Sequence, residues 1–158
     1  MNVKEYTVFV NEQRIPYLSE IRDTGLTDEK SYNTPQLIGE AVKELYHAEL
    51  LLEEHIWMLA LDTKNHLLGI FEVTKGTYNS SVINPSQLLQ RALLCGAVGI
   101  ALAHNHPSGV VEPSREDVLL TTRVMEAARI CGIQLVDHVI ISGAGRKKLY
   151  SFTENSEL

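Results

Sequence analysis

The chain has 158 residues, a length that suits one domain better than two. Hydrophobic residues make up 44% of it, enough for a buried core, and no run of about 18 uncharged apolar residues predicts a membrane-spanning helix. The net charge of −6 argues against a general polyanion binder, because non-specific nucleic-acid affinity comes mostly from basic residues on phosphates.

Residues 1–33 are interpreted as an N-terminal extension with one short strand, at residues 6–10, followed by polar, turn-rich sequence. Charges are spread through its opening residues, so it does not have the pattern of a signal peptide. The chain has only two cysteines, Cys95 and Cys131, which makes a reducing compartment the default. We therefore expect a cytoplasmic protein with no disulfide.

Residues 34–158 are predicted to form one compact domain that begins with a helix. Thr34 supplies a capping hydroxyl and Pro35 suits the first helical position, and apolar residues then recur at helical spacing over residues 36–53. A β-hairpin follows, with strands at residues 55–61 and 67–74 and a turn at residues 62–65.

The second half of the chain alternates helices with apolar strands. Asn84 and Pro85 begin a helix over residues 86–95, and Gly96 ends it. The uninterrupted apolar run after it predicts a strand covered on both faces. The remaining elements are strand 97–103, helix 115–131, strand 133–142 and a short edge strand at 149–152. This order predicts a sheet with helices packed on its faces, an α/β or mixed α+β domain.

Two histidines, His104 and His106, stand where the strand at 97–103 ends. Because side chains on a strand repeat every second residue, both imidazoles point the same way. Ser114 caps the next helix, and Asp117 lies in its first turn, where the carboxylate can fold back toward the strand end. Two imidazoles and one carboxylate leave a fourth tetrahedral position open, as in catalytic zinc sites, and they suit zinc better than iron or manganese.

Each of these residues also has a simpler explanation. Ser114 and Asp117 could form only a helix cap, in which Asp117 contacts a backbone N–H. His104 and His106 could be polar residues that end a strand. The combination of H-x-H with S-x-x-D at this spacing favours the metal site over the separate explanations.

Residues from about 49 to 152 resemble the catalytic domain of RadC proteins, and the metal pattern resembles the JAMM signature of JAB/MPN metalloproteases. The stretches that carry the resemblance are EH (54–55), LDTKN (61–65), GT (76–77), AHNHPSG (103–109), PSREDV (113–118) and VDHVII (136–141). The resemblance implies a cytidine-deaminase-like, three-layer α/β/α sandwich with a mixed sheet. It also implies a Zn²⁺-dependent hydrolase that acts on the amide bonds of a protein or peptide.

The resemblance further implies an upstream glutamate that serves as general base and acid, with Ser114 completing the site. Glu53 and Glu54 both lie where the first long helix is expected to end. Acidic residues oppose the helix dipole there, which favours a functional reason for one of them. Glu54 directly precedes the His-Ile strand, as in the RadC pattern, and is preferred. Ser114 could cap the helix and also donate to the developing oxyanion.

Other polar residues give weaker signals. His138 is interpreted as a satisfied core histidine or one behind a metal ligand, and Asp137 could orient a metal-bound imidazole. The cluster Arg146–Lys148 is interpreted as a solvated turn between two strands. The chain departs from the RadC pattern at Asn84, at Ser86-Gln87 and at Val110-Val111, which leaves substrate choice open.

Several other functions remain as alternatives. The letters H-N-H at 104–106 suggest a nuclease, but that label describes residues spread across a ββα-metal unit. A non-catalytic scaffold of the same fold, or a DNA-associated repair factor, would also fit the family. The first 48 residues lack the glycine-hairpin pattern of the DNA-associated region in longer RadC proteins. A zinc deaminase would require a C-x-x-C pair, which the sequence does not contain.

Overall fold

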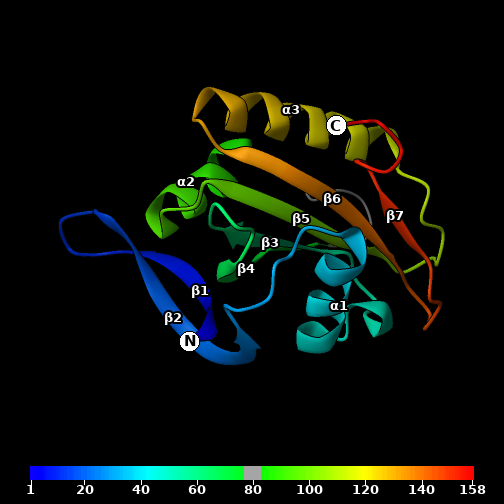
Figure 1. Ribbon diagram of the computed structural model, residues 1–158, viewed down its shortest axis with the longest axis horizontal. Helices are drawn as coiled ribbons and strands as arrows, with labels where there is room; N and C mark the ends of the chain where they lie inside the picture. The colour runs from blue at the N-terminus through cyan, green and yellow to red at the C-terminus, as the bar shows by residue number, and fades with distance from the viewer. Residues whose placement is uncertain (77–82) are drawn as a thin grey trace.

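The structure is a computed structural model that describes residues 1–76 and 83–158. Within these ranges, seven strands form one sheet in the order β2-β1-β4-β3-β5-β6-β7 (Figure 1). The strands are β1 (Asn2–Val10), β2 (Pro16–Thr27), β3 (His55–Leu61), β4 (Leu67–Lys75), β5 (Gly99–His106), β6 (Gln134–Ser142) and β7 (Leu149–Ser151). The helices are α1 (Pro35–Tyr46), the 3-10 turn η1 (Ala48–Leu50), α2 (Pro85–Cys95) and α3 (Arg115–Ile130). Thr77, which belongs to the family resemblance, lies outside the described residues.

The sheet is mixed, and helices cover both of its faces. β3 pairs antiparallel with β4 and β5, whereas β5 and β6 are parallel, as are β1 and β4. Helix α1 lies on one face, and α2 and α3 lie on the other (Figure 1). The three-layer α/β/α fold expected from the resemblance is therefore confirmed.

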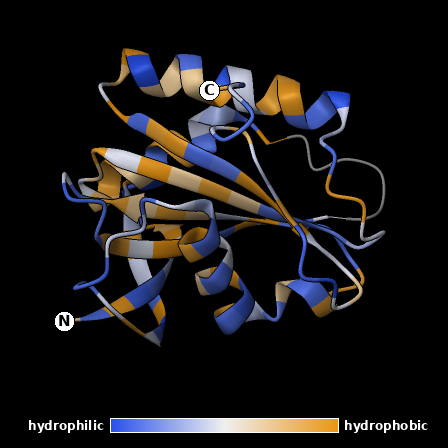
Figure 2. Cartoon of the chain, turned by 45° about the vertical axis from the view of Figure 1, so that its right-hand side comes forward, coloured by the Kyte–Doolittle hydropathy of each residue, from blue (hydrophilic) through white to orange (hydrophobic). Residues whose placement is uncertain are grey.

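Side-chain alternation along the central strands builds two separate cores. Every residue of β3 is buried, because a helical layer lies over each face. Trp57 and Leu59 pack in the cluster under α1, whereas Ile56 and Met58 pack in the cluster under α2 and α3. Figure 2 shows hydrophobic colouring along these strands and mixed colouring on the helices that cover them. The same alternation on β5 directs side chains at even-numbered positions toward α2 and α3.

The helices begin at the predicted capping residues. The side chains of Thr34, Asn84 and Ser114 each accept a backbone N–H from the first turn of α1, α2 and α3 respectively. Gly96 ends α2 in the left-handed conformation, at φ 69°. These local signals explain why the helix starts were predictable.

Helix α1 is shorter than predicted, because it ends at Tyr46 and not near residue 53. His47 adopts the left-handed conformation at φ 50°, and its N–H donates to the Lys43 carbonyl at 2.9 Å. Glu53 and Glu54 therefore lie in the link between η1 and β3, and the helix-dipole argument for their placement was wrong.

The N-terminal region forms a hairpin, where the sequence predicted only one strand over residues 6–10. Strand β2 was missed because its residues are exposed or half-buried throughout, so it lacks the apolar alternation of a strand with one buried face. Strand β1 pairs in parallel with β4, and the rings of Tyr6 and Phe71 lie 6.1 Å apart. None of the described helices is long and apolar enough to cross a membrane.

Candidate metal centre

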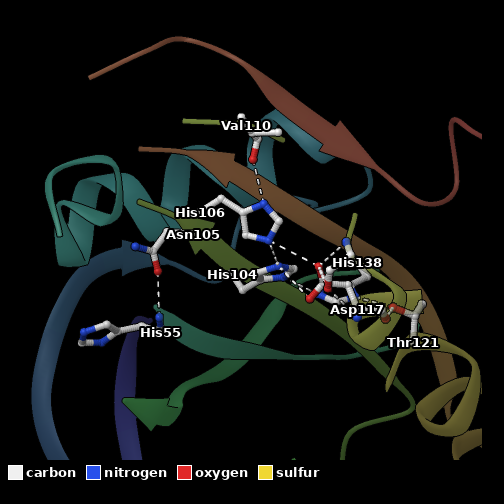
Figure 3. A network of polar contacts seen from close by, with 9 residues as sticks. His55, His104, Asn105, His106, Val110, Asp117, Thr121 and His138 are labelled. Atoms are coloured by element: carbon white, nitrogen blue, oxygen red, sulfur yellow. Dashed lines mark hydrogen bonds and ion pairs between the residues drawn. The ribbon is translucent and has the colours of Figure 1, made fainter. Parts of the chain in front are cut away.

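Four side chains from three parts of the chain meet at the end of β5. His104 and His106 come from β5, Asp117 comes from the first turn of α3, and Glu54 precedes β3. Each offers a ligand atom, and these atoms all lie within 4.8 Å of one another. Glu53 is not a member of this group. Figure 3 shows both imidazoles and the Asp117 carboxylate pointing toward one another.

The two oxygens of Asp117 face one imidazole each. Oδ1 lies 3.3 Å from Nε2 of His104, and Oδ2 lies 3.3 Å from Nε2 of His106. The two Nε2 atoms are 2.9 Å apart. His104 and Asp117 are buried, whereas His106 and Glu54 are half-buried and border solvent. A buried carboxylate is costly without a positively charged or donating partner, and a cation between the imidazoles would supply one.

A chain of hydrogen bonds sets the tautomer of His104. The Thr121 hydroxyl donates to the Asp117 carbonyl at 2.6 Å, so it accepts from Nδ1 of His138, also at 2.6 Å. Nε2 of His138 then accepts from Nδ1 of His104 at 2.8 Å (Figure 3). This assignment follows from the network and leaves the lone pair of His104 Nε2 directed into the site.

The tautomer of His106 is set in the same way by the backbone. Nδ1 of His106 donates to the Val110 carbonyl at 2.7 Å, so Nε2 carries the lone pair. Two imidazole lone pairs this close repel each other unless a cation or a proton lies between them. The donor set therefore fits a cation, and its nitrogen and oxygen atoms are ligands that zinc accepts.

The close contacts at the site also shift the pKa values of several of its titratable groups. Burial alone would raise the pKa of Asp117, but the contacts with His104 and His106 hold that pKa well below its usual range. Burial opposes protonation of His106, yet its contacts with Asp117 and the Val110 carbonyl raise its pKa. Complete burial, reinforced by the neighbouring His104, lowers the pKa of His138 well below its usual value. His138 is therefore the neutral relay that the network requires.

Ser114 and Asp117 do form the capping box that the simpler interpretation proposed. The backbone N–H and the hydroxyl of Ser114 each donate to Asp117 Oδ2 at 2.7 Å, and the Asp117 N–H donates back to the hydroxyl at 3.1 Å. The cap and the approach to the imidazoles coexist, because a carboxylate has about four acceptor positions. The Ser114 hydroxyl hydrogen is directed at Asp117.

Asn105 fixes the backbone on both sides of Glu54. Its Oδ1 accepts from the His55 N–H at 2.8 Å, and its Nδ2 donates to the Glu53 carbonyl at 3.0 Å. The Gly76 N–H donates to the Glu54 carbonyl at 2.9 Å. Asn105 is fully buried and lies between the two histidines on β5, so one strand positions both imidazoles and the glutamate. A cavity of about 210 Å³ opens beside the site, lined by Glu54, His106, Pro107 and Ser108.

Other residues lie differently from their sequence interpretations. Asp137 does not orient a metal-facing imidazole: it accepts from the Ser151 hydroxyl at 2.7 Å and the Thr153 N–H at 3.1 Å. His55, the first residue of β3, is buried, and its Nδ1 lies 2.6 Å from a carboxylate oxygen of Glu72.

The sequence interpretation overlooked two residues, Asn105 and Thr121. The signal for the first is an asparagine between two histidines at the end of a strand expected to be buried, since a buried amide needs partners. For the second, the signal is helical spacing: Thr121 lies four residues after Asp117 and reaches that residue's carbonyl.

Comparison with known proteins places this site in a family. The family model for the RadC-like JAB domain matches residues 32–157. The chain belongs to this family. The match contains all four site residues, whereas the β1–β2 hairpin lies outside it.

Curated relatives in this family support the assignment. A UPF0758 protein of Thermotoga maritima is 37% identical over 127 residues, which are 78% of this chain and 56% of the relative. One from Streptococcus suis is 35% identical over 133 residues, or 84% of this chain and 52% of the relative. One from Desulforudis audaxviator is 47% identical over 88 residues, or 56% of this chain and 38% of the relative. The chain thus spans about half, or less, of the length of these relatives.

Proposed function

We propose that this domain is a zinc-dependent amide hydrolase that cuts a peptide or isopeptide bond. The observation that carries the proposal is the position of Glu54, which shares a cluster with His104, His106 and Asp117 and also lines the adjoining cavity. A carboxylate that only completed a closed structural site would not need to border that cavity. Membership of the JAB domain family is consistent with hydrolysis.

The residues present fit a zinc ion. His104, His106 and Asp117 would hold it, since both Nε2 lone pairs and a carboxylate oxygen converge there. When bound, the ion would polarise a substrate carbonyl and lower the pKa of water from above 15 to about 7.

Glu54 has the properties of a general base. It is half-buried, lies beside His106 in the cavity wall, and is held by the backbone contacts of Asn105. In the proposed reaction its carboxylate accepts a proton from the attacking water and then delivers that proton to the leaving amine. The carboxylate is ready for a second cycle once the amine leaves.

Ser114 supports the site first through Asp117. Its hydroxyl donates to Oδ2, which orients the carboxylate toward both imidazoles. Donation to the oxyanion, the role implied by the family resemblance, requires this O–H to turn away from Asp117. We therefore assign Ser114 a positioning role, with oxyanion stabilisation as a second one.

The test compares Glu54→Gln with the matched variant Glu53→Gln, in zinc content and in hydrolysis of a peptide pool. Glu54→Gln is expected to keep zinc and lose about 10²-fold or more in kcat, whereas Glu53→Gln keeps both. Full activity in Glu54→Gln would remove Glu54 from the reaction, and loss of zinc would make it a ligand.

Two other candidates are outcomes of the same experiment. A purified protein without stoichiometric metal and without hydrolysis would favour a non-catalytic scaffold of this fold. Cleavage of DNA in the presence of zinc or magnesium would favour a nuclease, although the net charge of −6 disfavours that function.

A further inference from the structure

The loop between β6 and β7, residues 143–148, lies directly against the turn that carries His106. The Gly143 N–H donates to the His106 carbonyl at 2.9 Å, and the Ser142 hydroxyl donates to the Gly109 carbonyl at 3.1 Å. The same turn, through Pro107 and Ser108, lines the cavity beside the metal site. The loop is therefore a neighbour of the candidate active site, far from it only in sequence.

The contact between loop and turn is close. A Cβ atom on Gly143 would lie 2.7 Å from Pro107 Cα and 2.6 Å from the His106 carbonyl oxygen. A Cβ atom on Gly109 would lie 3.2 Å from both Cδ and Nη1 of Arg146. The Arg146 side chain thus packs over the glycine that follows the cavity-lining residues.

Backbone hydrogen bonds hold the loop in place. The Ser142 N–H donates to the Lys148 carbonyl at 3.1 Å, and the Arg146 N–H donates to the Gly143 carbonyl at 3.3 Å. The Gly145 N–H donates to the Glu49 carbonyl at 3.2 Å, which ties the loop to η1. An ordered loop positions its charges at lower entropic cost than a flexible one.

This loop carries three consecutive cations, Arg146, Lys147 and Lys148. All three are exposed, and none forms an ion pair with a carboxylate in the part of the chain that the structure describes. The sequence interpretation was a solvated turn. The structure adds that this turn packs against the residues that line the cavity, His106 and Pro107, in a chain whose net charge is −6.

We propose that residues 143–148, here called the basic loop, bind a carboxylate of the substrate, with Arg146 as the main contact. The preferred substrate is then an acidic peptide whose carboxylate lies within a few residues of the scissile bond. The inference rests on the proposed function. A guanidinium held against a rigid turn suits this role, because it can form two parallel hydrogen bonds with a carboxylate.

The number and the distribution of the positive charges in the basic loop favour a peptide ligand over a nucleic acid. Nucleic-acid affinity grows with the number of phosphates neutralised, typically through many dispersed basic residues. The basic loop offers three cations in one place, and the cavity next to it is lined by the acidic Glu54. That arrangement suits the binding of one or two carboxylates. It does not suit contacts with the many successive phosphates of a nucleic-acid backbone.

The test measures binding without cleavage, so it stays informative if hydrolysis is absent. Two fluorescent peptide pools of equal length are compared on zinc-loaded Glu54→Gln protein by anisotropy: one is rich in Glu and Asp, the other in Gln and Asn. We expect at least tenfold tighter binding of the acidic pool, and loss of that preference in Arg146→Ala. Lys64→Ala is the matched control. It also removes one positive charge, but Lys64 lies in the turn of the β3–β4 hairpin, at the end away from Glu54.

The outcomes separate the sources of the carboxylate. Amidating the peptide C-terminus leaves the preference for the acidic pool intact if acidic side chains are bound, whereas it weakens the binding of both pools alike if a terminal carboxylate is bound. Equal binding of both pools would overturn the proposal, as would equal effects of Arg146→Ala and Lys64→Ala. A labelled DNA oligonucleotide that binds more tightly than the acidic pool, and is released by Arg146→Ala, would also overturn it. Zinc content confirms that each variant is folded.

Discussion

His104 Nδ1 lies 2.8 Å from His138 Nε2, so a second, neutral imidazole stands directly behind the first candidate ligand. His138 in turn contacts Thr121 on α3, and Thr121 contacts the backbone carbonyl of Asp117. One network therefore joins β6 to β5 and α3, and β5 and α3 supply three of the four site residues. The network sets the direction of the His104 lone pair before any metal binds.

Replacing His138 with leucine should weaken zinc binding. The variant leaves the His104 Nδ1–H without its acceptor and the Thr121 hydroxyl oxygen without its donor, so we expect a 10- to 100-fold loss of zinc affinity. Unpaired buried groups also predict a loss of about 1–3 kcal/mol in stability. Competition with a chromophoric chelator measures the affinity, and circular dichroism confirms the fold. Unchanged affinity in a folded variant would show that the relay does not support the ligand.

Asn105→Ala should separate metal binding from catalysis. Asn105 contacts the backbone beside Glu54 and lies on the face of β5 opposite to the imidazoles, so zinc affinity should stay near that of the unmodified protein. Freeing the Glu54 backbone should lower kcat about 10- to 100-fold, because small misplacements of a catalytic group are costly. Parallel zinc titration and steady-state kinetics give both readouts. A variant with normal kcat would rule out the positioning role of Asn105.

Ser114→Gly should separate the role of Ser114 as a helix N-cap from the role of its hydroxyl in the reaction. Glycine at an N-cap costs only a few tenths of a kcal/mol relative to serine, whereas alanine costs about 0.5–2 kcal/mol. Thermal unfolding should therefore show Ser114→Gly near the stability of the unmodified protein and Ser114→Ala below it. Both variants lose the hydroxyl contact with Asp117 and should lose kcat to the same extent. If kcat falls in Ser114→Ala but stays near normal in Ser114→Gly, as stability does, then Ser114 acts through the helix cap alone.

Gly143→Ala should displace the backbone of His106 and so weaken the metal site. The added methyl group would meet backbone atoms of His106 and Pro107 at 2.6–2.8 Å, which side-chain rotation cannot relieve. Overpacking of this kind costs about 1–3 kcal/mol, and displacement of His106 should weaken zinc binding as well. Gly132→Ala is the control, because it strains a positive φ of 70° but meets no atom within 4 Å. Equal zinc affinity in the two variants would contradict tight contact between loop and turn.

The sequence predicted those features that depend on local signals. Pro35, Pro85 and Ser114 mark helix starts, and the period of two on β5 places His104 and His106 on one face. Strand β2 was missed because neither of its faces is fully buried, and the end of α1 was missed because His47 adopts a left-handed conformation. Tertiary partners left no comparable signal: Asn105 bonds residues 50 and 52 positions away, and the contact of Arg146 with Gly109 depends on the packing of two loops.

The most direct test of the metal centre is anomalous diffraction at the zinc edge from crystals grown with zinc. We expect one peak bonded to Nε2 of His104, Nε2 of His106 and a carboxylate oxygen of Asp117, at about 2.0–2.2 Å from each. Glu54 should remain near the ion without bonding it, with a solvent molecule between them. A peak at another position, or no peak where these three side chains converge, would contradict the assignment.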